Sequence, residues 1–275
     1  MKKYFVFSDV HGSFTALDQA LKNAGFDANN QDHMLLGLGD YFDRGSQSKE
    51  VYEFLKEFQK LGRGFYLSGN HDEFFWEYLA GDDGLYNFEY NGMWETVKSF
   101  TGLKGGKENM YILNEFARDR INEDYGVKTL IAKMPYGFTL DNYVFTHAGL
   151  KYDIVKDAWV VDVWAKSNDF VENFPEEKEN KVYVFGHWHA FRLTGQFYKG
   201  HKSEKWTNVE LLALTPEDFK TFTYKNFIGL DGCTNMSGLV NVLVVESDAA
   251  PQPFYEYQVK DSCPGEKLEY ELDKN

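Results

Sequence analysis

The sequence predicts an α/β fold in which two packed, mixed β-sheets are flanked by helices. Short apolar runs alternate with amphipathic helical stretches through the first third of the chain, a pattern typical of parallel βαβ units. The second half contains apolar runs separated by turn residues, which predicts further β-structure. Polar clusters follow apolar runs from residue 9 to residue 189, and a boundary near the middle would divide them. We therefore expect a single domain over residues 1–275.

The first predicted strand ends at Ser8 and leads into a polar cluster. Ser13 is expected to cap the helix that follows, and Gly25 is expected to end it. One face of this helix is apolar, and its members are Phe14, Leu17, Leu21 and Ala24.

Two further strands and one helix complete the predicted N-terminal unit. The strands are expected over residues 34–38 and 65–67, with a helix between them that starts near Gln47 and ends at Gly62. Parallel strands joined by helices place ligands at the carboxyl ends of the strands. The apolar stripe of the helix is Val51, Phe54, Leu55, Phe58 and Leu61.

The segment over residues 82–133 is rich in Gly, Asn and aromatic residues. Helical fragments are expected over 111–116 and 127–132. This segment is interpreted as a helical cap or lid over the site, and an ordinary helical connection is the alternative.

The second half is predicted to be mainly β-structure. Residues 136–140 and 143–146 flank Asp141-Asn142 and are expected to form a hairpin with a two-residue turn. Further strands are expected over residues 182–185, 227–230, 239–245 and 254–259.

The composition excludes several classes of protein. The net charge of −14 and pI near 5.0 argue against general nucleic-acid binding, including a nuclease, although bound metals could still attract phosphates. No run reaches the roughly 18 apolar residues of a membrane span. The N-terminal apolar run is too short for a signal peptide and leads directly into Asp9. Two cysteines, Cys233 and Cys263, suit a reducing compartment, so we expect a cytoplasmic protein.

Five clusters of possible metal ligands each follow an apolar run. Carboxylate, amide and imidazole groups are ligands for divalent cations, and strand ends can present them in one crevice. The pattern predicts a two-metal phosphoesterase site. The clusters are Asp9-Val10-His11, Gly39-Asp40-Tyr41-Phe42-Asp43-Arg44-Gly45, Gly69-Asn70-His71-Asp72, Thr146-His147-Ala148-Gly149 and Gly186-His187-Trp188-His189.

Some of these residues also have a structural alternative. Asp43 and Arg44 could form a surface ion pair in a turn. His187 and His189 could be core or rim histidines. His33 and His201 lie outside every cluster and are interpreted as structural.

Taken in order, the clusters resemble the calcineurin-like metallophosphoesterases, and most of all their phosphoprotein phosphatase branch. That branch includes bacterial and phage serine/threonine phosphatases and symmetrical dinucleoside tetraphosphatases. The resemblance covers residues 4–190, and the segment 229–233 looks like a late strand end of bacterial members. It implies an αββα sandwich.

The resemblance implies a role for each residue. Asp9, His11 and Asp40 would hold one metal, joined by His189, and a metal-bridging water would be the nucleophile. His71 would be the general acid, oriented by Asp43. Arg44 and Asn70 would contact the substrate. The ligands of the second metal would be Asp40, Asn70, His147 and His187.

One departure concerns the second phosphate-binding arginine of the family. The chain has no arginine between Arg120 and Arg192, and the segment 164–170 resembles the bacterial segment that carries it. Lys166 is the nearest substitute, with charge but no bidentate fork. A solvated surface lysine is the alternative.

The leading hypothesis is therefore a dinuclear metal-dependent serine/threonine protein phosphatase acting on phosphorylated proteins. A hydrolase of dinucleoside polyphosphates or another small phosphoester is the alternative, because the same site can serve both. A non-catalytic scaffold is disfavoured because every central ligand is in place. Manganese is expected, and iron, zinc and cobalt fit the same mixed ligands.

Overall fold

The first β-sheet carries three of the predicted ligand clusters. The computed structural model describes residues 1–81, 85–174, 180–201, 205–255 and 258–259. The strand order is β11-β1-β2-β3, in which β1, β2 and β3 are parallel and β11 is antiparallel to β1. This confirms the predicted parallel βαβαβ unit. Its strands are β1 (Lys2–Phe7), β2 (His33–Gly37), β3 (Gly64–Tyr66) and β11 (Val242–Ser247).

The second sheet has six strands in the order β12-β4-β5-β8-β10-β9. β4 and β5 form the predicted hairpin, with Asp141 in the left-handed region at φ 52°. β5, β8 and β10 are parallel neighbours, so their carboxyl ends meet at one edge. The strands are β4 (Gly137–Leu140), β5 (Tyr143–Thr146), β8 (Val182–Phe185), β9 (Phe222–Tyr224), β10 (Phe227–Gly229) and β12 (Gln252–Phe254).

A small third sheet, in the order β13-β7-β6, was not predicted. The single strand expected over 254–259 is wrong in part: β12 pairs with β4, whereas β13 pairs with β7. Residues 256–257 lie outside the described residues. Apolar content cannot show that two parts of one run pair with different sheets. The strands are β6 (Leu150–Asp153), β7 (Ala158–Val161) and β13 (Gln258–Val259).

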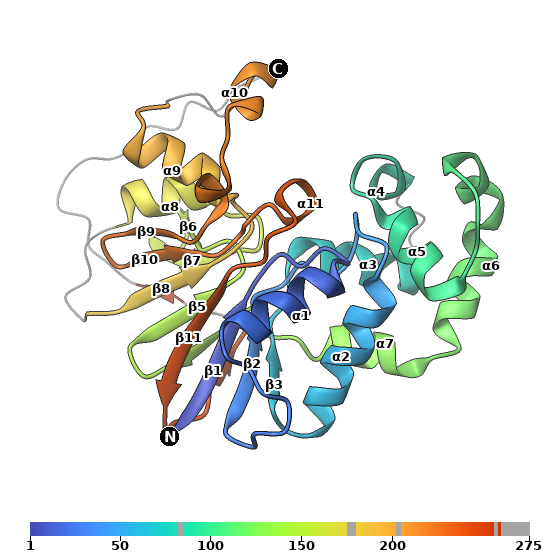
Figure 1. Cartoon of the computed structure of the whole chain (residues 1–275), viewed down its shortest axis with the longest axis horizontal. Coiled ribbons are helices and arrows are strands. Elements are labelled where there is room, and N and C mark those ends of the chain that lie inside the picture. Colours follow the sequence, from blue (N-terminus) through green and yellow to red (C-terminus); the bar gives the residue numbers. More distant parts are fainter. Residues whose placement is uncertain (82–84, 175–179, 202–204, 256–257, 260–275) are drawn as a thin grey trace.

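Helices cover the outer face of each large sheet, which gives four layers (Figure 1). Alternate residues of β1 point to opposite faces: Tyr4 and Val6 lie in the core between the sheets, and Phe5 and Phe7 pack under the helices. This confirms the predicted sandwich. The covering helices are α1 (Phe14–Asn23) and α2 (Ser48–Lys60) on the first sheet, and α8 (Ser167–Asn173) and α9 (Ala190–Tyr198) on the second.

Helix α1 begins where it was predicted, but the predicted N-terminal cap is wrong. Ser13 occupies the predicted position before α1, but its side chain makes no capping hydrogen bond to the helix. Its hydroxyl instead donates to the carbonyl oxygen of His11 at 3.4 Å, within the loop that follows β1. The predicted apolar face is confirmed at Leu17 and Leu21, which are buried.

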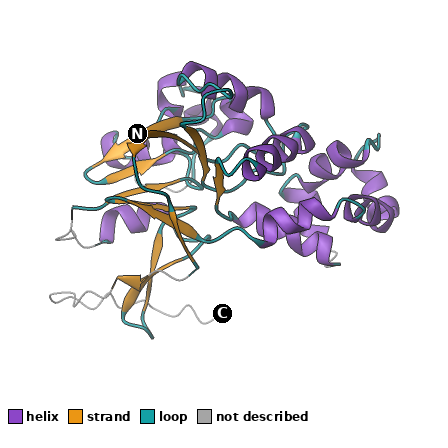
Figure 2. Ribbon diagram, turned by 90° about the horizontal axis from the view of Figure 1, so that it is seen from below, coloured by secondary structure: helices purple, strands orange, loops and turns teal. Residues whose placement is uncertain are grey.

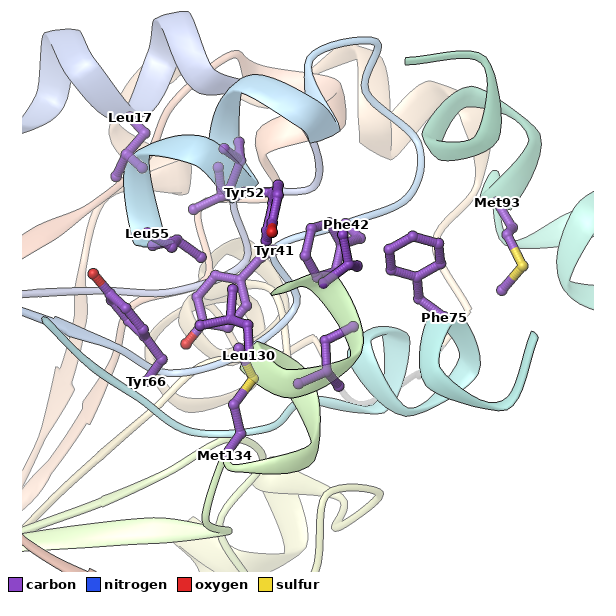
Figure 3. Packing of buried hydrophobic residues seen from close by; sticks show 14 of the residues in the cluster. Leu17, Tyr41, Phe42, Tyr52, Leu55, Tyr66, Phe75, Met93, Leu130 and Met134 are labelled. Carbon is purple, nitrogen blue, oxygen red and sulfur yellow. The ribbon is translucent and has the colours of Figure 1, made fainter. Parts of the chain in front are cut away.

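Residues 85–132 are more helical than predicted. The helices pack against α3 in a cluster that includes Phe42, Phe75, Met93 and Leu130 (Figure 3), and they form a separate helical side of the molecule (Figure 2). Only fragments of α6 and α7 were predicted, because α4 and α5 are short, with six and nine residues. Their role as a lid stays a prediction. They are α4 (Leu85–Tyr90), α5 (Met93–Thr101), η1 (Lys107–Asn109), α6 (Met110–Asn122) and α7 (Tyr125–Ala132).

The remaining helices are α3 (Asn70–Ala80), α10 (Asn208–Leu212), η2 (Pro216–Phe219) and α11 (Thr234–Ser237). Across the described ranges, none of the helices has the length and apolar character needed to cross a membrane.

Candidate active site

The loops that follow the strands hold site residues in a strained backbone conformation. Asp9, Asp40 and His187 all have positive φ, at 52°, 56° and 61°. A non-glycine residue in this region costs on the order of 1–3 kcal/mol, which surrounding structure must offset. The same strain at three separate strand ends indicates that these loops are shaped for function.

Two glycines allow the loops after β2 and β3 to touch. A Cβ atom on Gly69 would lie 2.3 Å from Asp40 Oδ1, and one on Gly39 would lie 2.5 Å from the backbone nitrogen of Gly69. Gly39 also has a φ of 90°. Only glycine fits at these positions, so the motif glycines bring the loop of Asp40 against the start of α3.

Asp40 lies at the centre of the site. Its Oδ1 accepts a hydrogen bond from the backbone N–H of His71 at 2.9 Å and lies 3.3 Å from His147 Nε2. Its Oδ2 lies 3.6 Å from His11 Nε2. Burial alone would raise the pKa of Asp40, but the surrounding imidazoles of His147, His71 and His11 hold it below its usual value. Asp40 is therefore a buried carboxylate that faces several ligand groups.

The first group of possible metal ligands has a donor set that fits a cation. His147 Nδ1 donates to the carbonyl oxygen of Leu38 at 2.7 Å, so its Nε2 carries a lone pair. That Nε2 lies 3.0 Å from Asn70 Oδ1 and faces Asp40, so three acceptors converge. Ligand atoms of Asp40, His147 and His187 lie within 4.8 Å of one another. A divalent cation would compensate this cluster of lone pairs.

His187 has the neutral form that metal binding requires. Its Nδ1 lies 3.0 Å from Asn70 Oδ1. Burial and the neighbouring His147 lower the pKa of His187 to about 3, so the ring is unprotonated near neutral pH.

A second group gathers around His11. Its Nδ1 donates to the carbonyl oxygen of Phe42 at 3.0 Å, which leaves Nε2 as an acceptor facing the site. Burial, followed by the charge of Arg44, lowers the pKa of His11. Within the described residues, ligand atoms of His11, Asp40 and His71 lie within 4.8 Å of one another.

Asp9 lies beside these groups, at the wall of the same cavity. Its Oδ2 accepts hydrogen bonds from Ser8 Oγ at 2.5 Å and from the backbone N–H of His187 at 2.9 Å. Asp9 thus links the ends of β1 and β8, and its role as a metal ligand stays a prediction.

His71 is oriented by Asp43. Its Nδ1 lies 2.9 Å from Asp43 Oδ2, and both side chains are buried. Burial alone would lower the pKa of His71, but Asp40 and Asp43 raise it above its usual value. The ring is held with Nε2 toward the cavity, which is the orientation that a general acid needs.

Arg44 bridges two of these rings. Its Nη1 lies 2.9 Å from His11 Nε2, and its Nη2 lies 3.0 Å from His71 Nε2. The planar guanidinium therefore lies at the cavity between the predicted metal ligands and the predicted acid. From there it can donate to two phosphate oxygens.

The cavity at these residues has a volume of about 200 Å³. Phe74, Asn91 and Trp164 also belong to its wall. Sequence analysis gave none of them a role, although Trp164 begins the segment 164–170. Lys166 is exposed at the start of α8 and is absent from this lining within the part of the chain described. The lining residues are Asp9, His11, Asp40, Arg44, Asn70, His71, Phe74, Asn91, Trp164, His187 and His189.

Asp231 is an acidic residue at a sixth strand end, and sequence analysis did not assign it a role. It follows β10, is buried, and its Oδ2 lies 3.7 Å from His189 Nε2. Burial raises the pKa of Asp231 to about 7 and lowers that of His189 to about 3. The resemblance of segment 229–233 to a family strand end was the signal that could have identified it.

Thr96 is a second residue that sequence analysis missed. It comes from α5, and its hydroxyl accepts from the backbone N–H of Asp43 at 2.7 Å and donates to Asp43 Oδ1 at 3.1 Å. No sequence pattern links residues 53 positions apart.

Thr96→Val is expected to lower the free energy of unfolding by about 1–3 kcal/mol, because the buried Asp43 loses both hydrogen bonds. It should also lower kcat, since Asp43 orients His71. Thr96→Ser keeps the hydroxyl and is the control. Denaturant unfolding and steady-state kinetics measure both effects, and wild-type behaviour of the valine variant would contradict this role.

Comparison with curated proteins identifies relatives over part of the chain. The chain is 26% identical over 159 residues to the asymmetrical bis(5'-nucleosyl)-tetraphosphatase PrpE of Halalkalibacterium halodurans, with 55% of this chain and 58% of that protein aligned. It is 25% identical over 158 residues to the protein of the same name from Bacillus subtilis strain 168, with 54% and 59% aligned. The chain thus spans less than two thirds of the length of these relatives.

A solved structure with a similar fold is the cold-active protein-tyrosine phosphatase of a psychrophilic Shewanella species. The TM-score is 0.50 with 16% sequence identity, over 90% of this chain and 76% of that chain. The profile described as calcineurin-like phosphoesterase matches residues 2–191, which is more than half of the sequence. With the strand-end ligands and the four-layer fold, this match shows that the chain belongs to the calcineurin-like phosphoesterase family.

Proposed function

We propose that this metal-dependent phosphoric ester hydrolase works with two divalent cations held around Asp40. The observation that carries the proposal is the convergence of imidazole ligand atoms on this one buried carboxylate from both large sheets. Asp40 would be shared, with His11 and Asp9 on one side and Asn70, His147 and His187 on the other. Bound divalent cations supply an activated water and neutralise charge on the phosphate.

The surrounding residues would position the phosphate and the leaving group. Arg44 would donate to two phosphate oxygens, and its contacts with His11 and His71 place it between the metal ligands and the acid. His71 would give its Nε2 proton to the leaving oxygen while Asp43 stabilises the imidazolium. Most of the acceleration would come from this fixed electrostatic arrangement.

Two substrate classes are proposed. The names of the relatives favour a dinucleoside tetraphosphate or a related small phosphate compound. The ordered motifs, which resemble the phosphoprotein phosphatase branch, favour phosphoserine and phosphothreonine in proteins.

A side-by-side assay tests both proposed substrate classes. Protein stripped of metal and then loaded with manganese, zinc, iron or cobalt would be given phosphopeptides and diadenosine tetraphosphate. We expect metal-dependent phosphate-ester or anhydride cleavage with at least one of them. Absence of turnover with every metal and substrate would contradict the proposed function.

Lys166 provides a separate prediction. If it replaces the missing second arginine, Lys166→Ala should weaken inhibition by inorganic phosphate, and Lys166→Arg should strengthen it by restoring a bidentate donor. The inhibition constants and kcat/KM of both variants measure this. Wild-type values in both would assign phosphate recognition to Arg44 and the metals.

A further inference from the structure

Two aromatic side chains in the wall of the active-site cavity have no part in the chemistry described above. Trp164 lies between β7 and α8, and Phe74 lies in the first turns of α3. Their ring centroids are 5.3 Å apart. Trp164 is 52% exposed and lines the cavity, so part of its ring is open to a ligand that enters there.

This aromatic wall, Phe74 and Trp164, adjoins the predicted acid. The Phe74 ring lies 5.5 Å from the His71 imidazole, nearly perpendicular to it at 74°. The Trp164 ring lies 6.3 Å from the imidazole of His187. The wall therefore reaches from the general acid to the second predicted metal site.

The position of His71 decides which part of a substrate meets the wall. In the proposed hydrolysis, the water oxygen bonds to phosphorus, the bond from phosphorus to the leaving oxygen breaks, and His71 gives its proton to that oxygen. A group bound beside His71 is therefore attached to the leaving oxygen. Phe74 and Trp164 lie where they would contact this leaving group.

The backbone that carries both rings of the wall is anchored within the fold. The Trp164 backbone N–H donates to Asp162 Oδ1 at 2.7 Å, which fixes the start of the loop before α8. Phe74 is carried by α3, the helix that begins at Asn70. A rigid aromatic surface loses little entropy when a planar ring stacks on it.

We propose that Trp164, supported by Phe74, stacks the base of the leaving nucleotide, and so selects nucleoside polyphosphates. This inference rests on the proposed function. Serine and threonine esters carry no ring at this position, whereas a nucleotide carries a planar base, and the relatives are named as nucleosyl tetraphosphatases. Stacking of one base on an aromatic side chain contributes about 1–3 kcal/mol.

The test compares substrates that share a phosphoanhydride and differ in the base. Diadenosine tetraphosphate and inorganic tripolyphosphate would be assayed with wild type and Trp164→Ala. We expect KM for the dinucleotide to rise about 5- to 150-fold, with kcat changed less and with KM for tripolyphosphate raised far less than that for the dinucleotide. Trp164→Tyr, which keeps a ring, should restore most of the loss.

Trp76 offers a matched control. It lies on the same helix as Phe74 and is 42% exposed, but is absent from the described cavity lining. Trp76→Ala should leave both substrates unaffected. Calorimetric binding of adenosine monophosphate and of inorganic phosphate adds a readout that needs no turnover, and Trp164→Ala should weaken only the nucleotide.

Several results would overturn the inference. Equal losses on both substrates, or no loss on the dinucleotide, would show that Trp164 does not recognise the base. If Trp164→Ala lowers kcat/KM more for a phosphotyrosine peptide than for the dinucleotide, the aromatic wall binds an aryl ester and not a base. If wild type hydrolyses tripolyphosphate or phosphopeptides but not the dinucleotide, the proposed hydrolase function is upheld and the proposed base-binding site is rejected. If nothing is hydrolysed, the proposed function fails, and the binding comparison alone decides the base site.

Discussion

Asp40→Asn is expected to remove most of both metal ions and to lower turnover by more than about 10²-fold. A neutral amide replaces the charge that faces both groups of ligands, one through His11 and one through His147. Loss of a residue that only supports a ligand already costs about 10- to 100-fold in metal affinity or activity, and Asp40 is predicted to bind directly. Elemental analysis of matched preparations gives the metal stoichiometry.

Asp218→Asn is the control for this variant. Asp218 is also buried, but its carboxylate accepts hydrogen bonds from the backbone and hydroxyl of Thr215, each at 2.9 Å, and pairs with Lys199 outside the cavity lining described. The Asp218→Asn variant should therefore retain the metal content of the wild type. Two bound metals and normal turnover in Asp40→Asn would refute the assignment of Asp40 as the shared ligand.

His71→Asn is expected to keep both metals and to lower kcat by about 10²- to 10⁴-fold, the usual contribution of a positioned proton donor. The His71 ring is anchored by Asp43, and Arg44 contacts the opposite nitrogen. The loss should be largest for alkyl esters, whose leaving oxygens need a proton, and smallest for nitrophenyl esters.

Metal analysis of the same variant separates two roles. His71 belongs to a tight group with His11 and Asp40, so it could also bind a metal. Metal loss in His71→Asn would assign it as a ligand, and equal kinetic losses for alkyl and nitrophenyl esters would argue against proton donation. Asp43→Asn is a useful companion, because it weakens the orientation of His71 without changing the ring.

The local parts of the fold could be predicted because their information lies in neighbouring residues. The apolar run of β1 and the apolar face of α1, which recurs about every 3.6 residues, both lie within a short window of sequence. The strand-end clusters were identified for the same reason. Helices α4 and α5 were missed because each is short, and packing in the cluster around Phe75 and Met93 stabilises them.

By itself, the sequence determined the sandwich of two sheets, the family and the strand-end residues, since glycine turns and ligand types recur at short spacing. Tertiary structure alone decided which distant groups meet. The backbone of His187 binds Asp9 across 178 positions, Thr96 supports Asp43, and Asp231 faces His189. Trp164 likewise joined the cavity wall only through folding. These contacts depend on how sheets and helices pack, and packing distances leave no period or motif in a linear sequence.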